Sequence, residues 1–174
     1  MKKICVVLLA VFLFAGCGEK KTYETISDGL ETPKTPGQLE IIANLPDGAV
    51  TPVFTSADGA KLYEIGDYSV TVQVAAAGDF PGLVQQITGY LPEKLQIMES
   101  AQGGMKSYQA VWSAAGEGQT QVGRACILTD GNYYYVLTAM VPESKAGELY
   151  QGALKEMFAS FHAVPSDQII SSGS

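Results

Sequence analysis

Residues 106–141, KSYQAVWSAAGEGQTQVGRACILTDGNYYYVLTAMV, decide the fold of this chain. They contain three strand-like runs, at about 106–114, 120–129 and 133–141. Short glycine-bearing loops separate these runs, GEG at 116–118 and DGN at 130–132. Strands joined this tightly must be antiparallel, because a parallel crossover needs about a dozen residues or more. The stretch therefore predicts an antiparallel meander.

Further strands are predicted before the meander. Residues 68–74 alternate between apolar and polar side chains, which is typical of a half-buried strand. The run 62–65 precedes them across a Gly66-Asp67 turn, so the two runs form a predicted hairpin. Another strand is expected at about 94–100, joined to the meander by a glycine-bearing loop.

Two short helices are predicted in the first half of the chain. Asp79 can cap a helix whose first turn tolerates Pro81 and which ends before Pro92. Its apolar face consists of Leu83, Val84, Ile87 and Leu91. A weaker pattern at 39–43 is compatible with a strand, and we expect a short helix there.

A long helix is predicted at 146–161. Apolar residues recur there at helical spacing, namely Ala146, Leu149, Tyr150, Ala153, Leu154, Met157, Phe158 and Phe161. Gly147 and Gly152 lie inside it and each costs about 1 kcal/mol relative to alanine, so packing on the sheet must hold this helix. We expect His162 in its last turn, where a histidine complements the helix dipole.

These elements predict one α+β domain. Its antiparallel sheet has about five or six strands in the order ββαββββα, with helices packed on it. A chain of 174 residues with 47% hydrophobic residues carries enough apolar material for one such core.

The C-terminal half is similar to the Mog1/PsbP-like family, which includes the DcrB-type bacterial lipoproteins. The similarity rests on GNYYYVLT at 131–138, ELY at 148–150 and FASF at 158–161, within a resemblance that spans about 60–162. It implies a central antiparallel sheet with helices on its faces. It also implies a protein that binds other proteins or has no assigned activity, and a shared fold does not transfer a function.

The first seventeen residues have the layout of a signal peptide. Lys2 and Lys3 precede an apolar run at 4–15 that is too short to span a bilayer as a helix. The sequence LFAGC at 13–17 resembles the lipobox of bacterial lipoproteins, with Phe14 where leucine is commonest. The resemblance implies cleavage between Gly16 and Cys17 and a diacylglycerol thioether on the Cys17 sulfur. The alternative is an ordinary secreted protein with a chance cysteine.

This reading divides the chain into four parts. Residues 1–16 are the signal peptide, 17–37 the lipidated cysteine and a flexible tether, 38–163 the domain, and 164–174 a flexible tail. As a free coil, the tether allows the domain to swing up to about 70 Å from its anchor. Cleavage changes the net charge from −7 to −9, so we expect the domain to stand off anionic headgroups.

The cysteine pattern leaves one thiol in the mature chain. Cys5 is removed with the signal peptide and Cys17 is lipidated, so Cys126 has no intramolecular partner. A reactive thiol or an intermolecular disulfide is one interpretation, and a small buried hydrophobic residue is the favoured one.

Composition and motifs argue against several functions. The acidic charge makes nucleic acid a poor partner, because binding it depends on basic residues that neutralise phosphates. We found no nucleophile motif of the G-x-S-x-G or S-x-x-K type, no phosphate loop and no EF-hand loop. We therefore expect no enzymatic activity, no metal site and no cofactor.

Aromatic residues are the remaining candidates for a site. Tyr133, Tyr134 and Tyr135 are consecutive, so on a strand they must point to both faces of the sheet. The favoured interpretation is a place in the core. If Tyr134 is exposed beside Tyr108 or Trp112, these three form a candidate docking surface.

The sequence therefore predicts a lipid-anchored protein on the extracytoplasmic face of a bacterial cell membrane. Our first hypothesis for the function is a binding or accessory role, with another envelope protein as the partner. An alternative is a lipoprotein that binds a small hydrophobic ligand or lipid between sheet and helix. A third hypothesis is a hydrolase built on two carboxylates.

Overall fold

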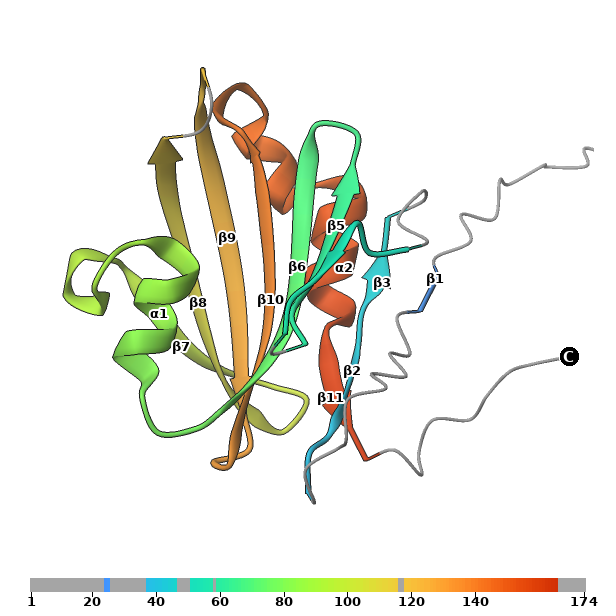
Figure 1. Cartoon of the computed structure of the whole chain (residues 1–174), viewed down its shortest axis with the longest axis vertical. Coiled ribbons are helices and arrows are strands. Elements are labelled where there is room, and N and C mark those ends of the chain that lie inside the picture. The colour runs from blue at the N-terminus through green and yellow to red at the C-terminus, as the bar shows by residue number, and fades with distance from the viewer. Residues whose placement is uncertain (1–23, 26–36, 47–50, 58, 116–117, 166–174) are drawn as a thin grey trace, which may run out of the picture.

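The computed structural model describes residues 24–25, 37–46, 51–57, 59–115 and 118–165 (Figure 1). The predicted signal peptide, the cleavage site at Gly16 and Cys17, and the end of the predicted tail (166–174) lie outside the described residues. Among the described residues, no helix combines the length and the apolar character needed to cross a membrane.

A seven-stranded antiparallel sheet forms the centre of the molecule. Its strands are ordered β4-β5-β6-β10-β9-β8-β7. Their bounds are β4 Phe54–Thr55, β5 Lys61–Ile65, β6 Tyr68–Ala76, β7 Ile97–Gln102, β8 Met105–Ala115, β9 Thr120–Thr129 and β10 Tyr133–Pro142. The predicted α+β class, antiparallel pairing and ββαββββα order are confirmed. The strand count is higher than expected because β4 adds an edge strand too short to leave a pattern in the sequence.

Two cores lie on opposite faces of this sheet. Alternate residues of β10 separate them, because Tyr135 and Leu137 point to one face while Tyr134 and Val136 point to the other. The larger core lies under helix α2 (Gly152–Ser160), and we call its side of the sheet the α2 face. The smaller core lies under helix α1 (Phe80–Thr88), on the α1 face. Figure 1 shows α1 in front of β8 and α2 behind β5 and β6.

Helix α1 begins where the sequence indicates. The Asp79 carboxylate accepts a hydrogen bond of 2.9 Å from the Gly82 amide, and Pro81 stands in the first turn. The helix ends at Gly89, which has a φ of +79° and whose amide donates to the Gln85 carbonyl. Leu91 therefore lies outside the helix and is exposed, contrary to its predicted place on the apolar face. A short 3₁₀ helix follows at Pro92–Lys94, labelled η1.

The single helix predicted at 146–161 is wrong. A 3₁₀ helix, η2 (Glu143–Tyr150), is followed by Gln151 in an extended conformation, and α2 begins at Gly152. Gly152 has a φ of +52°, a left-handed conformation that glycine adopts readily and that interrupts the helix. The interruption has one consequence for the surface, because Tyr150 is exposed instead of buried with the rest of its predicted apolar stripe.

The helix expected at 39–43 is also wrong. Residues Glu40–Ile42 form strand β2, which pairs with β11 (His162–Val164). Ile41 is buried and its two neighbours on β2 are partly exposed, which is a strand pattern. His162 consequently starts β11 instead of completing the last helix, and its Nδ1 contacts the Ser160 carbonyl.

A second small sheet lies next to β2. Strand β3 (Asn44–Leu45) pairs antiparallel with β1 (Glu24–Thr25), with Glu24 opposite Leu45. Strand β1 belongs to the segment that the sequence assigns to the tether. A short part of that segment is therefore paired with the domain.

Candidate interaction surface

The three aromatic residues proposed as a docking surface lie together on the α1 face. Tyr108 and Tyr134 are half-buried and pack around Phe80 of α1, with ring centroids 4.4 and 5.8 Å from the Phe80 ring. Trp112 is 6% exposed. The structure brings the three residues onto one face and places them in or against the core, with helix α1 packed over the two tyrosines.

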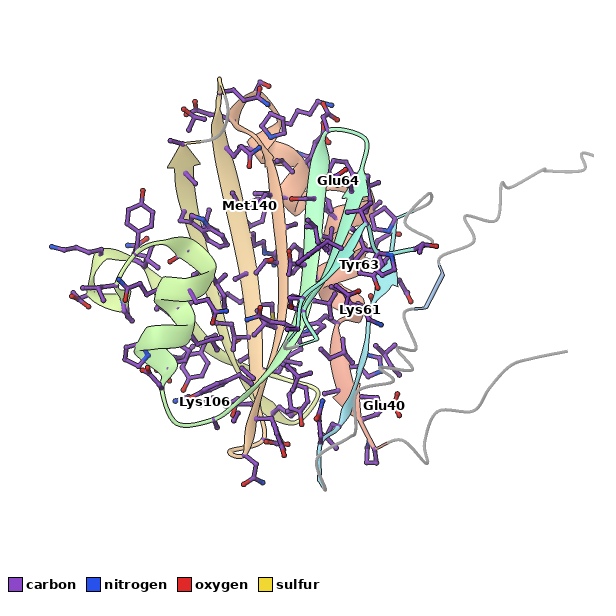
Figure 2. The ribbon with its side chains drawn as sticks, viewed as in Figure 1. Glu40, Lys61, Tyr63, Glu64, Lys106 and Met140 are labelled. Carbon is purple, nitrogen blue, oxygen red and sulfur yellow. The ribbon has the colours of Figure 1, made fainter. Side chains whose placement is uncertain are left out.

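The indole ring of Trp112, a residue of β8, lies over Gly123 of the neighbouring strand β9. Trp112 is in register with Gly123 of β9, and a Cβ added at Gly123 would overlap its indole ring and the Met140 sulfur. Glycine is therefore required at this position for packing. Figure 2 shows Met140 on β10 in the upper part of the sheet, beyond α1.

The α2 face is incompletely covered at its far edge. Its buried core takes residues from β5, β6, β9 and β10 but none from β7 or β8. Paired residues on neighbouring strands point to the same face of the sheet. Gln109 of β8, which is opposite the core residue Cys126, therefore points to the α2 face. Gln102 at the end of β7 still contacts α2, because its side-chain amide donates to the Phe158 carbonyl. The surface beyond the core is formed by the remaining residues of this face on β7 and β8.

Three exposed apolar residues gather there around an arginine. Met98 is opposite Gln109 and Val111 is opposite Arg124, so all four side chains lie on the α2 face. Met98 is 64% exposed, Val111 38% and Tyr150 of η2 51%. We call this group, Met98, Gln109, Val111, Arg124 and Tyr150, the edge patch.

Arg124 organises the edge patch. Its guanidinium carbon lies 4.9 Å from the centre of the Tyr150 ring and 4.2 Å from that of Phe158. Its two terminal nitrogens donate hydrogen bonds of 2.9 Å to the Leu149 carbonyl and 3.1 Å to Gln109 Oε1. Arg124 therefore fixes η2 and α2 against β8 and β9.

Electrostatics distinguish this arginine from an ordinary surface cation. Burial lowers the pKa of Arg124, although the guanidinium keeps its charge at neutral pH. Among the ion pairs between described residues, none joins Arg124 to a carboxylate. The patch thus combines apolar side chains with a charge that is compensated by carbonyl and ring contacts.

The opposite face of the same edge is charged. Glu99 of β7 and Lys106 of β8 form an ion pair of 2.8 Å on the α1 face, and Lys106 Nζ lies 4.8 Å from the Tyr108 ring centre. Figure 2 shows Lys106 near the lower end of α1. Charged side chains on an edge strand discourage unspecific strand pairing. The large apolar side chains that β7 and β8 expose, Met98 and Val111, therefore both lie on the α2 face.

Other candidate groups are structural in this fold. The Cys126 thiol is buried, its sulfur lies 3.5 Å from the Ser107 hydroxyl, and burial raises its pKa. The favoured interpretation of Cys126 as a buried residue agrees with this position. No group of three or more potential metal-binding side chains occurs among the described residues.

The sequence did not single out the edge patch. Tyr150 follows the helical spacing of buried residues, and Arg124 belongs to a strand-like run without a motif around it. Exposure of this group depends on where α2 begins and how far it reaches. Those are tertiary features, so no local signal in the sequence could have located the patch.

One of three similar solved structures supports the fold. Cyanobacterial PsbP (CyanoP) from Synechocystis sp. PCC 6803 has a TM-score of 0.51 and 12% identity over 86% of this chain and 98% of that chain. LpqN, described as involved in cell envelope biogenesis of Mycobacterium tuberculosis, has a TM-score of 0.49 and 16% identity over 83% of this chain and 91% of its own. A Bacteroides thetaiotaomicron protein has a TM-score of 0.49 and 13% identity over 74% of this chain.

The identity to all three proteins is low, and one of them is matched over less than half of its length. This chain spans only 46% of the Bacteroides protein. No protein-family model and no curated protein sequence matches the chain. At 12% identity the likeness to CyanoP concerns the fold alone. The fold is a PsbP-like α+β fold.

Proposed function

We propose that this chain is a lipid-anchored bacterial envelope protein that binds another envelope protein through the edge patch and catalyses no reaction. The anchor is Cys17, which the lipobox-like sequence at 13–17 marks for cleavage and lipidation. Two or three acyl chains on one residue hold a protein stably at a membrane, whereas one chain binds marginally.

The observation that carries the binding role is the composition of the edge patch. Exposed methionine, valine and tyrosine side chains surround a half-buried arginine. Aromatic residues, methionine and arginine are enriched in protein interfaces, and tyrosine and arginine are frequent among the residues that dominate binding energy. A group of exposed apolar side chains that lie together on the surface favours the binding of a partner.

The position of the patch also suits a protein partner. Strand β7 is the last strand of the sheet, so its outer edge faces away from β8. A partner segment that covers Met98 and Val111 would also lie beside this open edge and could add main-chain hydrogen bonds to it. Arg124 is already fixed by Tyr150 and Phe158, so little side-chain entropy is lost on binding.

The lipid-binding alternative receives less support. The side chains between α2 and the sheet are large and fully or nearly fully buried, among them Leu154, Met157, Phe158 and Phe161. These side chains occupy the place where the sequence hypothesis would put a ligand. No observation on the described residues favours the carboxylate hydrolase.

Differential purification tests the proposal. The full-length protein is purified from its native membrane in mild detergent, together with a Met98→Ser, Val111→Ser double variant and a Leu91→Ser control. Leu91 is 42% exposed and lies outside the patch. We expect a stoichiometric partner protein with the wild type and the control, and at least about a tenfold loss of it with the patch variant, since one well-buried anchor contributes 2 kcal/mol or more. Identical sets of bound proteins in all three preparations would refute the role of the patch.

A further inference from the structure

The pairing of β1 with β3 fixes how far the domain can move from its anchor. Glu24 is only seven residues from Cys17, so a chain segment of at most about 25 Å joins β1 to the lipidated cysteine. A free tether up to residue 37 would allow about 70 Å. Because β1 is hydrogen-bonded to Asn44 and Leu45, the side of the domain that carries β3 stays near the bilayer.

An apolar edge follows directly on that side. Val53, which directly precedes β4, is only eight residues after Leu45 of β3, so it lies within about 28 Å of β3. Figure 1 shows β1 and β3 on the same side of the molecule. Val53 is 57% and Phe54 60% exposed, and Phe54 is the most exposed large aromatic side chain among the residues that the structure describes.

This apolar edge is held in place by the sheet. The Val53 amide donates a hydrogen bond of 2.8 Å to the Leu62 carbonyl, and Phe54 is opposite Leu62 in the β4–β5 pair. The turn that follows is closed by a hydrogen bond of 2.8 Å from the Ser56 amide to the Ala60 carbonyl. Val53 and Phe54 are therefore presented at a defined position.

We propose that Val53 and Phe54 form a contact surface for the phospholipid bilayer that carries the anchor. The inference rests on the proposed lipidation of Cys17. The short leash keeps the two side chains within reach of the interface, where apolar side chains bury about 5–10 Å deep. The net charge of −9 after cleavage gives anionic headgroups no attraction for the domain, so apolar burial has to supply the contact. The edge patch, at the opposite edge of the sheet, then faces away from the lipid and is open to a partner.

Fluorescence quenching in vesicles tests this orientation. The full-length lipidated protein is reconstituted into phosphatidylcholine vesicles that contain lipids with a quencher near the headgroup. One variant, Val53→Cys, carries an environment-sensitive label at the proposed contact, and a matched variant, Met98→Cys, carries it on β7, at the other edge of the sheet. We expect quenching at position 53 to exceed that at position 98 at least about threefold, because short-range quenchers report on side chains within the interface.

A pair of insertions tests the role of β1 independently. Twelve glycine and serine residues inserted after Gly18 lengthen the leash, and the same insertion after residue 30 leaves it unchanged if β1 stays paired. We expect the first insertion to abolish the difference between positions 53 and 98 and the second to preserve it. Equal quenching at positions 53 and 98 in vesicle-bound protein without an insertion, or equal effects of the two insertions, would overturn the inference. Neither result would contradict the proposed lipid anchor. A chain that does not float with the vesicles would overturn both.

Discussion

The indole of Trp112 occupies the space that any side chain at Gly123 would need. The two residues are opposite each other in the β8–β9 pair, and the Met140 sulfur closes the same space from β10. Trp112 is thereby almost completely buried on the α1 face, although it does not belong to the cluster that packs under α1.

Replacing Gly123 with alanine is expected to destabilise the domain by about 1–3 kcal/mol, because overpacking forces neighbouring side chains off their preferred rotamers. Denaturant unfolding monitored by the fluorescence of Trp112, the one tryptophan of the chain, measures this. Gly147→Ala is the control, since the nearest atom to its added Cβ would be Gln151 Nε2 at 3.8 Å. Unfolding midpoints that do not differ between the two variants would contradict the packing argument.

Tyr135→Phe is expected to cost about 1–3 kcal/mol, the usual penalty for a buried polar group that loses its partner. The buried Tyr135 hydroxyl donates to Asp130 Oδ2 at 2.8 Å and accepts from the Leu39 amide at 3.0 Å. Tyr133→Phe, at a half-buried ring 6.4 Å from that of Tyr135, serves as the control and should be close to neutral. The hydroxyl has no anchoring role if both variants unfold at the same denaturant concentration.

The Asp130 carboxylate is expected to make stability depend on acid pH. Partial burial alone would raise its pKa, but hydrogen bonds from the Tyr133 and Asn132 amides and the Tyr135 hydroxyl outweigh burial and lower it. A folded-state pKa below the unfolded value means that its stabilisation is complete above about pH 4 and is lost as pH falls through the folded-state pKa. We therefore expect the difference in unfolding free energy between wild type and Asp130→Asn to shrink between about pH 5 and pH 2. A difference that stays constant or grows over this range would refute the assignment.

A double-mutant cycle measures the contact between Arg124 and Tyr150. The variants are Arg124→Met, Tyr150→Ala and the combination, and we expect a favourable coupling of about 0.5–1 kcal/mol for the stacked cation. Part of the Tyr150 ring is exposed, so the coupling should stay at the lower end of the range for such contacts. A coupling of zero within error would mean that the ring does not hold the guanidinium.

The sequence predicted those parts of the fold that depend on short-range patterns. The hairpins of β5–β6 and of β7 to β10 follow from alternation and glycine turns, and the α1 N-terminus follows from Asp79 and Pro81. The predictions failed where distant partners decide. Residues 40–42 form β2 because they pair with β11, which lies about 120 residues away in the sequence, beyond any local pattern.

The break before α2 and the edge patch also could not be predicted from local sequence patterns. The apolar spacing at 146–161 continues through Gly152, so the period alone gives no sign that this residue adopts a left-handed conformation. Tyr150 is exposed because it precedes that break, and Val111 is exposed because it lies on a strand that contributes no buried residue to the core of this face. The lipobox-like motif differs from both, because a signal peptidase would recognise it from the local sequence alone, without the tertiary structure of the domain.

Mass spectrometry of the N-terminal peptide of the mature protein, isolated from its native membrane, tests the central claim most directly. We predict a peptide that begins at Cys17 and carries a diacylglycerol thioether, with or without an acylated amine. A mature protein that begins at an unmodified Met1, or one that begins at Cys17 with a free thiol, would contradict the account.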